Sequence, residues 1–232
     1  MAGLSPRLGS RLKSISAFPK DVFRLFMPPL CAVCEGALAP REARLCRDCM
    51  SELAAGMETG ERVVDVAGGG SLRVVFPLRY TPAVSRLIKD MKYSDRPGLA
   101  QVLAPFMAMA LSSVEILAPV LVPVPLHAAK RRERGYNQSD LLADGVAGLT
   151  GLTVLRSALR RVKNTSAQAG LDGEERLLNM RLAFRADGGV VAGHVVLIDD
   201  VLTTGATLGE CAGALRSQGI SEVTGCVVAS SA

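Results

Sequence analysis

The sequence predicts an α/β fold with a parallel sheet, helices on both faces and a small cysteine-rich module in front. Residues 195–198 form a short apolar run rich in β-branched side chains, which is typical of a strand buried on both faces of a parallel sheet. Two carboxylates, a hydroxyl-rich turn and a segment with helical spacing over residues 208–215 follow this strand. Four cysteines in two close pairs stand near the start of the chain.

The composition is that of a folded protein. The chain has 232 residues, of which 49% are hydrophobic and 21% charged, so it has the material for a packed core and room for one domain plus a small appendage. The formal net charge of +5 mildly favours anionic partners. Aromatic residues make up 4% with no Trp, which leaves little material for stacking nucleic-acid bases.

The N-terminal residues divide into a basic tail and a short apolar segment. Residues 1–17 contain arginine and lysine but no acid, and we expect a loose tail there. They lack the compact apolar run of a signal peptide. Residues 18–30 predict a short apolar helix that Pro28 and Pro29 end.

The paired cysteines predict a metal site. Cys31, Cys34, Cys46 and Cys49 form two pairs with eleven residues between them. Four thiolates suit one tetrahedral Zn²⁺, and a site with all four positions filled is structural. Zinc would contribute about 10–16 kcal/mol of apparent binding free energy to a segment with almost no core of its own. A redox pair is the alternative, but two adjacent pairs argue against it.

The metal interpretation also bears on the compartment. Without a signal peptide, clustered cysteines indicate a reducing compartment, and we expect a cytoplasmic protein. Cys211 and Cys226 have apolar neighbours and are expected in the core.

A glycine-rich stretch separates the predicted cysteine module from the predicted sheet. Residues 53–70 end in Gly68, Gly69 and Gly70, and we place the boundary there, with residues 18–66 as helix plus ribbon and 71–232 as the α/β domain. The elements expected next are a strand over residues 72–78, a helix from Pro82 to Lys92 capped by Thr81, a helix over 97–111 and a strand over 121–125.

Residues 97–126 carry a single charge, Glu115, and therefore resemble a membrane span at first sight. Several prolines and serines interrupt the run, whereas a span needs about 20 apolar residues in one element. A helix followed by a buried strand is the better prediction, with no membrane span.

The densest basic run of the chain follows the strand predicted at residues 121–125. Lys130, Arg131 and Arg134 are candidates for binding a pyrophosphate, because the ends of strands in α/β folds are where ligands bind. A solvated loop is the alternative. Asn137 is expected to cap the next helix, and Tyr136 beside the run is a candidate for stacking on a base.

The acidic pair and the turn after the strand at 195–198 predict a second anion site. A helix N-terminus offers free N–H groups and the positive end of its dipole, and Gly205 allows close approach of the backbone. Asp199 and Asp200 suit sugar hydroxyls or a Mg²⁺ ion beside a phosphate. The alternative is an ordinary helix cap. The candidate residues are Asp199, Asp200, Thr203, Thr204, Gly205, Ala206 and Thr207.

Residues 196–207 resemble the phosphoribosyl-pyrophosphate (PRPP) loop of the type I phosphoribosyltransferases. The resemblance implies that the acidic pair contacts the ribose hydroxyls, that the Thr-Thr-Gly turn holds the 5′-phosphate, and that Mg²⁺ accompanies PRPP. It also implies a type I phosphoribosyltransferase-like sheet.

Further motifs resemble the ComF competence family, from about residue 18 to the C-terminus. They are the four-cysteine ribbon, residues 122–126 and 134–138, Arg160, Arg161, Thr165, Gln168, Leu171, Arg176, Asn179 and Phe184. The family implies uptake of single-stranded DNA during natural transformation, with DNA-uptake proteins as partners.

The remaining segments are a polar loop, a helix and two extended pieces. Residues 163–173 are expected to form either a lid over the ligand, as in related transferases, or an ordinary surface loop. A short helix is expected over 174–180, an extended piece over 182–184 and the last strand over 222–228.

Three interpretations of function stay open at this point. The first is a ComF-type protein that binds PRPP or a related phosphoribosyl group and serves DNA uptake. The second is an active nucleobase or amido-type phosphoribosyltransferase, which the lack of a base-reading hood after the last strand disfavours. The third is a zinc-ribbon nucleic-acid adaptor, which the intact acidic pair and threonine turn disfavour.

Overall fold

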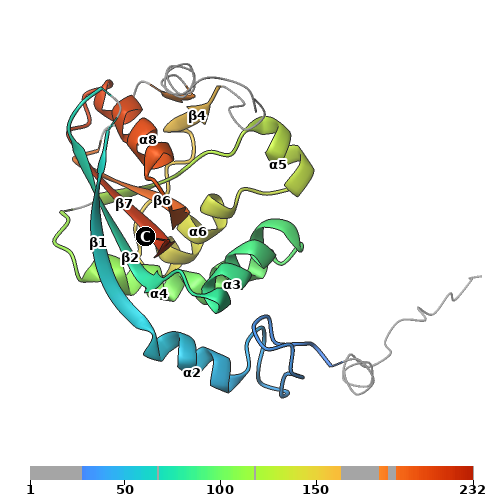
Figure 1. Cartoon of the computed structure of the whole chain (residues 1–232). Coiled ribbons are helices and arrows are strands. Elements are labelled where there is room, and N and C mark those ends of the chain that lie inside the picture. Colours follow the sequence, from blue (N-terminus) through green and yellow to red (C-terminus); the bar gives the residue numbers. More distant parts are fainter. Residues whose placement is uncertain (1–27, 67, 118, 163–182, 188–191, 232) are drawn as a thin grey trace, which may run out of the picture.

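Five strands form one sheet in the spatial order β1-β2-β7-β6-β3 (Figure 1). They are β1 (Met57–Asp65), β2 (Ser71–Arg79), β7 (Glu222–Ser230), β6 (His194–Leu202) and β3 (Pro119–Pro123). Strand β1 pairs antiparallel with β2, and all other neighbours are parallel. The predicted α/β fold is therefore confirmed, as a mostly parallel sheet. The parallel strands bring their carboxyl ends to one edge, where connections and ligand sites gather.

The computed structural model describes residues 28–66, 68–117, 119–162, 183–187 and 192–231 of the chain. The predicted tail at residues 1–17, nearly all of the predicted helix at 18–30, the loop at 163–173 and the helix at 174–180 lie outside these residues.

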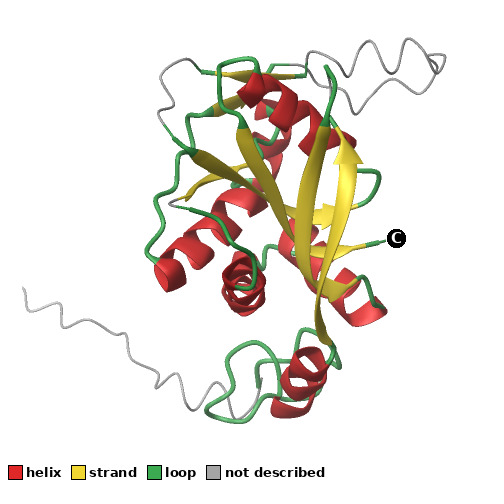
Figure 2. Cartoon of the chain, turned by 90° about the vertical axis from the view of Figure 1, so that its left-hand side faces the viewer, coloured by secondary structure: helices red, strands yellow, loops and turns green. Residues whose placement is uncertain are grey.

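Helices cover both faces of the sheet (Figures 1 and 2). One face packs against α3 (Pro82–Tyr93), α4 (Ala100–Ser112) and α6 (Gln138–Thr150), and the other against α8 (Ala206–Arg216) and the small hairpin of β4 (Leu159–Arg161) with β5 (Phe184–Ala186). Side chains of β6 alternate between the faces, with Val196 and Ile198 in the first core and Val195 and Leu197 in the second. The strand is buried on both faces, as its β-branched run predicts.

Residues 97–126 resolve into a 3₁₀ turn, η1 (Pro97–Leu99), then α4 and β3, in agreement with a helix followed by a strand. Across the described part of the chain, no helix has both the length and the apolarity that a bilayer span requires.

Helix α3 begins as its sequence predicts. Thr81 Oγ1 accepts a hydrogen bond from the Val84 N–H at 3.3 Å, and Pro82 occupies the first helical position. The side chains at helical spacing, Val84, Leu87, Ile88 and Met91, are all buried. This leaves Arg86 and Lys92 on other sides of the helix, where they are free to contact neighbouring elements.

Strand β1 is an element that the sequence does not predict. The sequence places residues 57–65 with the ribbon and its boundary, but they pair with β2 from Met57 opposite Leu78 to Asp65 opposite Ser71. The sequence of this strand lacks the alternating apolar pattern by which a half-buried strand is predicted, and only Val64 of the strand is buried. How the chain divides into domains remains a prediction.

The basic run after β3 is helical rather than a loop. Helix α5 (Ala128–Arg134) starts at His127, whose Nδ1 accepts from the Ala129 N–H at 3.3 Å, and ends at Gly135 with a left-handed φ of 82°. Alanine, lysine, arginine and glutamate all favour helices, which explains the difference. Asn137 then caps α6, as predicted, by accepting from the Ser139 N–H at 3.3 Å.

The start of α8 packs closely on the end of β1. A Cβ atom at Gly205 would lie 2.5 Å from Val64 Cγ1, and one at Gly209 would lie 2.3 Å from the carbonyl oxygen of Asp65. Both glycines therefore permit a backbone approach that no side chain allows.

We expect Gly209→Ala to destabilise the protein by about 1–3 kcal/mol, because the new methyl group meets backbone and not a side chain that can move. Gly148→Ala is the matched control, since this exposed helical glycine of α6 has open space around its Cα. The control should gain about 0.4–1 kcal/mol. Urea unfolding of both variants measures the change in the free energy of unfolding, which should fall in Gly209→Ala and rise in Gly148→Ala. Equal stability of Gly209→Ala and wild type would show that β1 does not press on α8.

Candidate functional site

The acidic pair lies inside the last part of β6 and not after it. The strand runs on past the predicted end at Ile198 as far as Leu202, and Asp199 is paired with Val227 of β7. Asp199 Oδ1 accepts a hydrogen bond from Ser139 Oγ of α6 at 2.9 Å. Asp200 is 4% exposed, and its Oδ1 lies 2.7 Å from the ammonium of Lys92 on α3. Three elements thus meet at the two carboxylates.

Burial and mutual repulsion set the charge of the pair. Burial, followed by the neighbouring Asp200 carboxylate, raises the pKa of Asp199 to about 7. Burial also disfavours the charge of Lys92, but Asp200 and then Asp199 outweigh it and raise the pKa of this lysine. Lys92 is therefore a cation at neutral pH, and the site carries less negative charge than two free carboxylates.

The threonine turn connects β6 to α8 and presents hydroxyls to solvent. Thr203, Thr204 and Thr207 are exposed, whereas Gly205 is buried with a left-handed φ of 82°. Thr204 Oγ1 accepts from the Ala206 N–H at 3.4 Å. Arg62 of β1 donates to the carbonyl oxygen of Thr203 at 3.3 Å. Arg62 therefore supports the turn from the side of β1. The hydroxyls of the turn and the N-terminus of α8 remain accessible to an anion.

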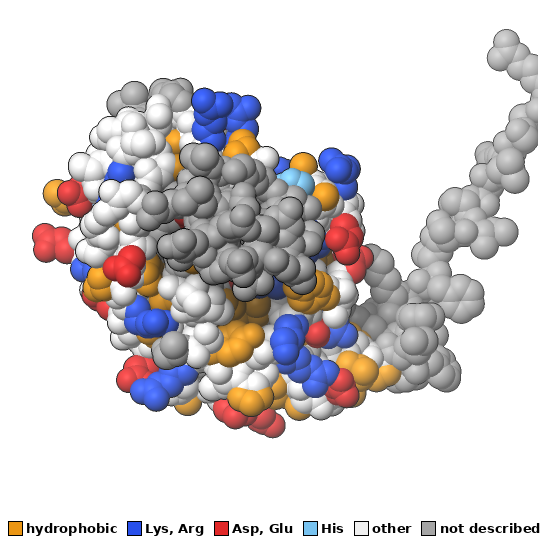
Figure 3. Space-filling model, turned by 45° about the horizontal axis from the view of Figure 1, so that its top comes forward, with side chains coloured by type: hydrophobic (Ala, Val, Ile, Leu, Met, Phe, Trp, Pro, Cys, Tyr) orange, Lys and Arg blue, Asp and Glu red, His pale blue; other side chains and the backbone are white. Residues whose placement is uncertain are grey.

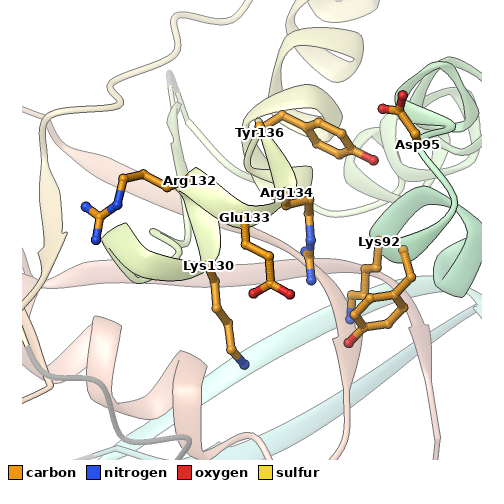
Figure 4. A pocket seen from close by; sticks show the side chains of 9 residues that line it. Lys92, Asp95, Lys130, Arg132, Glu133, Arg134 and Tyr136 are labelled. Atoms are coloured by element: carbon orange, nitrogen blue, oxygen red, sulfur yellow. The ribbon is translucent and has the colours of Figure 1, made fainter.

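A cavity of about 510 Å³ lies between α3 and α5 (Figure 4). Of the predicted pyrophosphate ligands, Lys130 and Arg134 line it. Arg131 does not, and its guanidinium lies 3.7 Å from Asp140 instead. Arg132 and Lys92 complete the cationic wall, and Glu133 and Asp95 are the acids beside it. The cavity suits an anion that accepts from several donors at once.

Two tyrosines also line this cavity. The predicted stacking residue Tyr136 is half-buried, and its hydroxyl donates to the carbonyl oxygen of Met91 at 2.5 Å. Tyr93 is 76% exposed, and the guanidinium of Arg134 lies 5.1 Å from its ring centre. Sequence reasoning missed Tyr93 and Lys92 because they end a helix far from the basic run in the chain. The adjacent Lys-Tyr pair at that helix end was the available signal.

The four cysteines come together as predicted. Their sulfur atoms all lie within 4.8 Å of one another, and Cys34 Sγ is 3.8 Å from Cys46 Sγ. A tetrahedral ion with Zn–S bonds of about 2.3 Å requires sulfur atoms about 3.8 Å apart. Burial opposes ionisation of Cys31, but backbone N–H groups, including those of Cys46 and Val33, lower its pKa to about 6. The cluster has the donor set and spacing to hold a metal ion.

The cysteine cluster is fixed to the α/β domain through α3. Arg86 donates to the carbonyl oxygen of Val33 at 3.1 Å, between the first two cysteines, and forms an ion pair with Glu35. Leu45 and Leu53 belong to the same buried core as Leu87 and Ile88. Helix α2 (Arg47–Ala55) then leads from the cluster into β1 (Figure 1).

Charged groups are mixed over one face of the molecule. In the space-filling view, Lys and Arg side chains of the described residues stand in separate groups with Asp and Glu between them (Figure 3). Four cationic side chains, Lys92, Lys130, Arg132 and Arg134, line the cavity between α3 and α5. This cavity is therefore the candidate local anion site.

Together these features define an α/β protein with a mostly parallel sheet, an acidic pair, a threonine turn and a cationic cavity at one end and a four-cysteine module in front. Comparison with known sequences agrees. The chain is 31% identical over 217 residues to the DNA utilization protein YhgH of Salmonella typhi. The aligned region covers 86% of this chain and 96% of that protein.

Two further relatives are less completely covered. The chain is 32% identical over 152 residues to competence protein F of Haemophilus influenzae, 62% of this chain and 66% of that protein. It is 34% identical over 100 residues to competence protein ComFC of Bacillus subtilis, 43% of this chain and 39% of that protein. No family model matches the chain. On the similarity that spans almost the full length of a relative, the chain belongs to the ComF family.

The raised pKa of Asp199 predicts a pH dependence of stability. The folded state keeps a proton that the unfolded chain releases near pH 4, so the stabilisation is present at low pH and is lost as pH rises through about 7. Between pH 5 and pH 8, wild type should lose about 2 kcal/mol relative to Asp199→Asn, which cannot ionise. Urea unfolding at both pH values measures the difference. Parallel pH profiles of the two proteins would show that Asp199 is ionised throughout.

Proposed function

We propose that this chain binds PRPP or another phosphoribosyl ligand at the carboxyl edge of its sheet. The observation that carries the proposal is the juxtaposition of Asp199 and Asp200 at the end of β6 with an open threonine turn and the N-terminus of α8. A phosphate suits the turn because hydroxyls and free N–H groups converge there. Hydroxyls of a ribose suit the carboxylates, which accept but cannot donate when ionised.

The cavity between α3 and α5 is the proposed place for the pyrophosphate. Lys130 and Arg134 are its proposed donors, with Arg132 in place of the predicted Arg131, whose charge is directed to Asp140. Tyr93 is the more exposed ring for stacking on a base, because the Tyr136 hydroxyl is already bound to backbone. Positioning and electrostatics of this kind are what binding of a charged sugar phosphate requires.

The proposal does not assign the acidic pair to Mg²⁺. One oxygen of Asp200 lies against the Lys92 ammonium, which already supplies a positive charge at this place. We keep Mg²⁺ only as the ion that PRPP brings with its pyrophosphate, and we assign no carboxylate of this chain to it.

The four-cysteine cluster is proposed to hold a structural Zn²⁺. Four thiolates at tetrahedral spacing are the donor set of closed zinc sites. All four positions are filled, so the ion would hold the ribbon together and leave no place for a substrate.

The relatives' names extend the proposal to DNA. One is called a DNA utilization protein and two are called competence proteins. We propose that ligand binding by this chain serves the uptake or use of DNA in the cytoplasm, with single-stranded DNA and DNA-uptake proteins as partners.

Calorimetric titration with PRPP and Mg²⁺ tests the ligand. Wild type should bind, Thr204→Ala should bind about tenfold more weakly because a hydrogen bond to a charged group is lost, and a variant with both aspartates changed to asparagine should show no measurable binding. Thr153→Ala, an exposed threonine outside the turn, is the matched control and should bind like wild type. A folded wild-type protein that does not bind PRPP would refute the proposed ligand.

Metal analysis of purified protein tests the ribbon. Wild type should carry about one zinc per chain, and Cys49→Ser should lose it because a closed site needs all four ligands. Cys226→Ala removes a buried cysteine of the core and should keep the metal. Zinc retained in full by Cys49→Ser would show that the cluster is not the site.

A further inference from the structure

Lys92 belongs to both halves of the candidate site. Its ammonium lies 2.7 Å from Asp200 Oδ1, and its side chain also lines the cavity that Lys130 and Arg134 line (Figure 4). The Lys92 side chain is 22% exposed and that of Asp200 is 5% exposed, so the lysine stands on the solvent side of the carboxylate. An anion in the cavity and the acidic pair would therefore compete for the same cation.

Asp200 has a capacity for hydrogen bonds that the described residues do not use. Its second oxygen, Oδ2, is buried and accepts no hydrogen bond among them. A buried carboxylate oxygen without a donor is unfavourable, and the hydroxyl of a bound sugar is a donor of the right kind. The Lys92 ammonium can donate either to Asp200 or to an anion in the cavity, because its side chain lies between the two.

We propose that Lys92 is a cation shared between the acidic pair and the anion cavity, which couples the binding of a pyrophosphate to the binding of a sugar diol. In the free protein Lys92 neutralises Asp200. When a ligand with both groups binds, the ammonium turns its charge to the phosphate oxygens, and a sugar hydroxyl donates to Asp200 in its place. This inference rests on the proposed function and adds a residue and a coupling to it.

The coupling selects for ligands that carry both groups. Inorganic pyrophosphate alone has to draw Lys92 from Asp200 without providing a donor to replace it. A neutral sugar alone meets a carboxylate already bound to its cation. A phosphoribosyl pyrophosphate does both, so each half of the ligand removes the cost of binding the other.

Calorimetric titration with inorganic pyrophosphate, without added Mg²⁺, tests the shared cation. The proteins are wild type, Asp200→Asn, Lys92→Met and the double variant. Asp200→Asn should bind pyrophosphate about three- to tenfold more tightly, because Lys92 is released, while its binding of PRPP weakens. Lys92→Met should bind pyrophosphate about tenfold more weakly, and adding Asp200→Asn to it should give no gain.

Asp95→Asn is the matched control for a general effect of charge, because Asp95 lines the same cavity. Its gain in pyrophosphate affinity should be the same with and without Lys92. If the gain in pyrophosphate affinity from Asp200→Asn is also the same with and without Lys92, the shared cation is refuted, and Asp200 affects the anion only through its charge at a distance. Thermal unfolding establishes that each variant is folded. Should Lys92→Met not fold, Lys92→Gln and Lys92→Arg make the same comparison with the charge removed and kept.

The outcomes also separate this inference from the proposed function. Wild type that binds neither pyrophosphate nor PRPP refutes both. Wild type that binds both, with an Asp200→Asn gain that does not depend on Lys92, refutes the shared cation and leaves the proposed ligand in place.

Discussion

Two neighbouring carboxylates at the end of β6 need partners, and the site is assembled from the elements that supply them. Asp199 receives the Ser139 hydroxyl from the start of α6, and Asp200 receives the Lys92 ammonium from the end of α3. Asn137, which caps α6, also donates to the carbonyl oxygen of Val124 at 3.0 Å and so fixes the start of that helix to the end of β3. Breaking either contact would leave a poorly solvated charge, which is costly in a protein interior. The acidic pair therefore orders the helices around it.

The threonine turn depends on close packing of the α8 backbone against the end of β1. Gly205 and Gly209 leave no side chain between the start of α8 and the end of β1, and Arg62 of β1 donates to the turn itself. Strand β1 is also the continuation of the cysteine module through α2. The strand that supports the turn is therefore the same one that joins the turn, through α2, to the four-cysteine cluster.

Local signals in the sequence predict much of this structure. The helix caps at Thr81 and Asn137, the buried strand at residues 195–198 and the paired cysteines each depend on neighbours in the chain, and all are confirmed. Strand β1 escapes prediction because only one of its side chains is buried. Strand β1 pairs with β2 through backbone hydrogen bonds, and these cannot be predicted from a pattern of apolar residues.

The sequence does not predict which basic side chains line the site, because their positions depend on the fold. Whether Arg131 or Arg132 faces the cavity depends on α5 being helical, since residues adjacent on a helix point about 100° apart. The contact between Lys92 and Asp200 joins residues 108 positions apart, and only the fold brings them together. Sequence patterns therefore locate the acidic pair and the turn but not the side chains that set their charge.

Helix α3 contacts both the cysteine cluster and the acidic pair within a short length of chain. Arg86 holds the backbone between the first two cysteines, and Lys92 holds Asp200, six residues further on. Six residues of helix span about 9 Å, less than two turns, and a helix is rigid over such a length. A movement of α3 as a rigid body would displace both contacts together. The position of the cysteine cluster and the position of Lys92 beside Asp200 are therefore linked through this one helix.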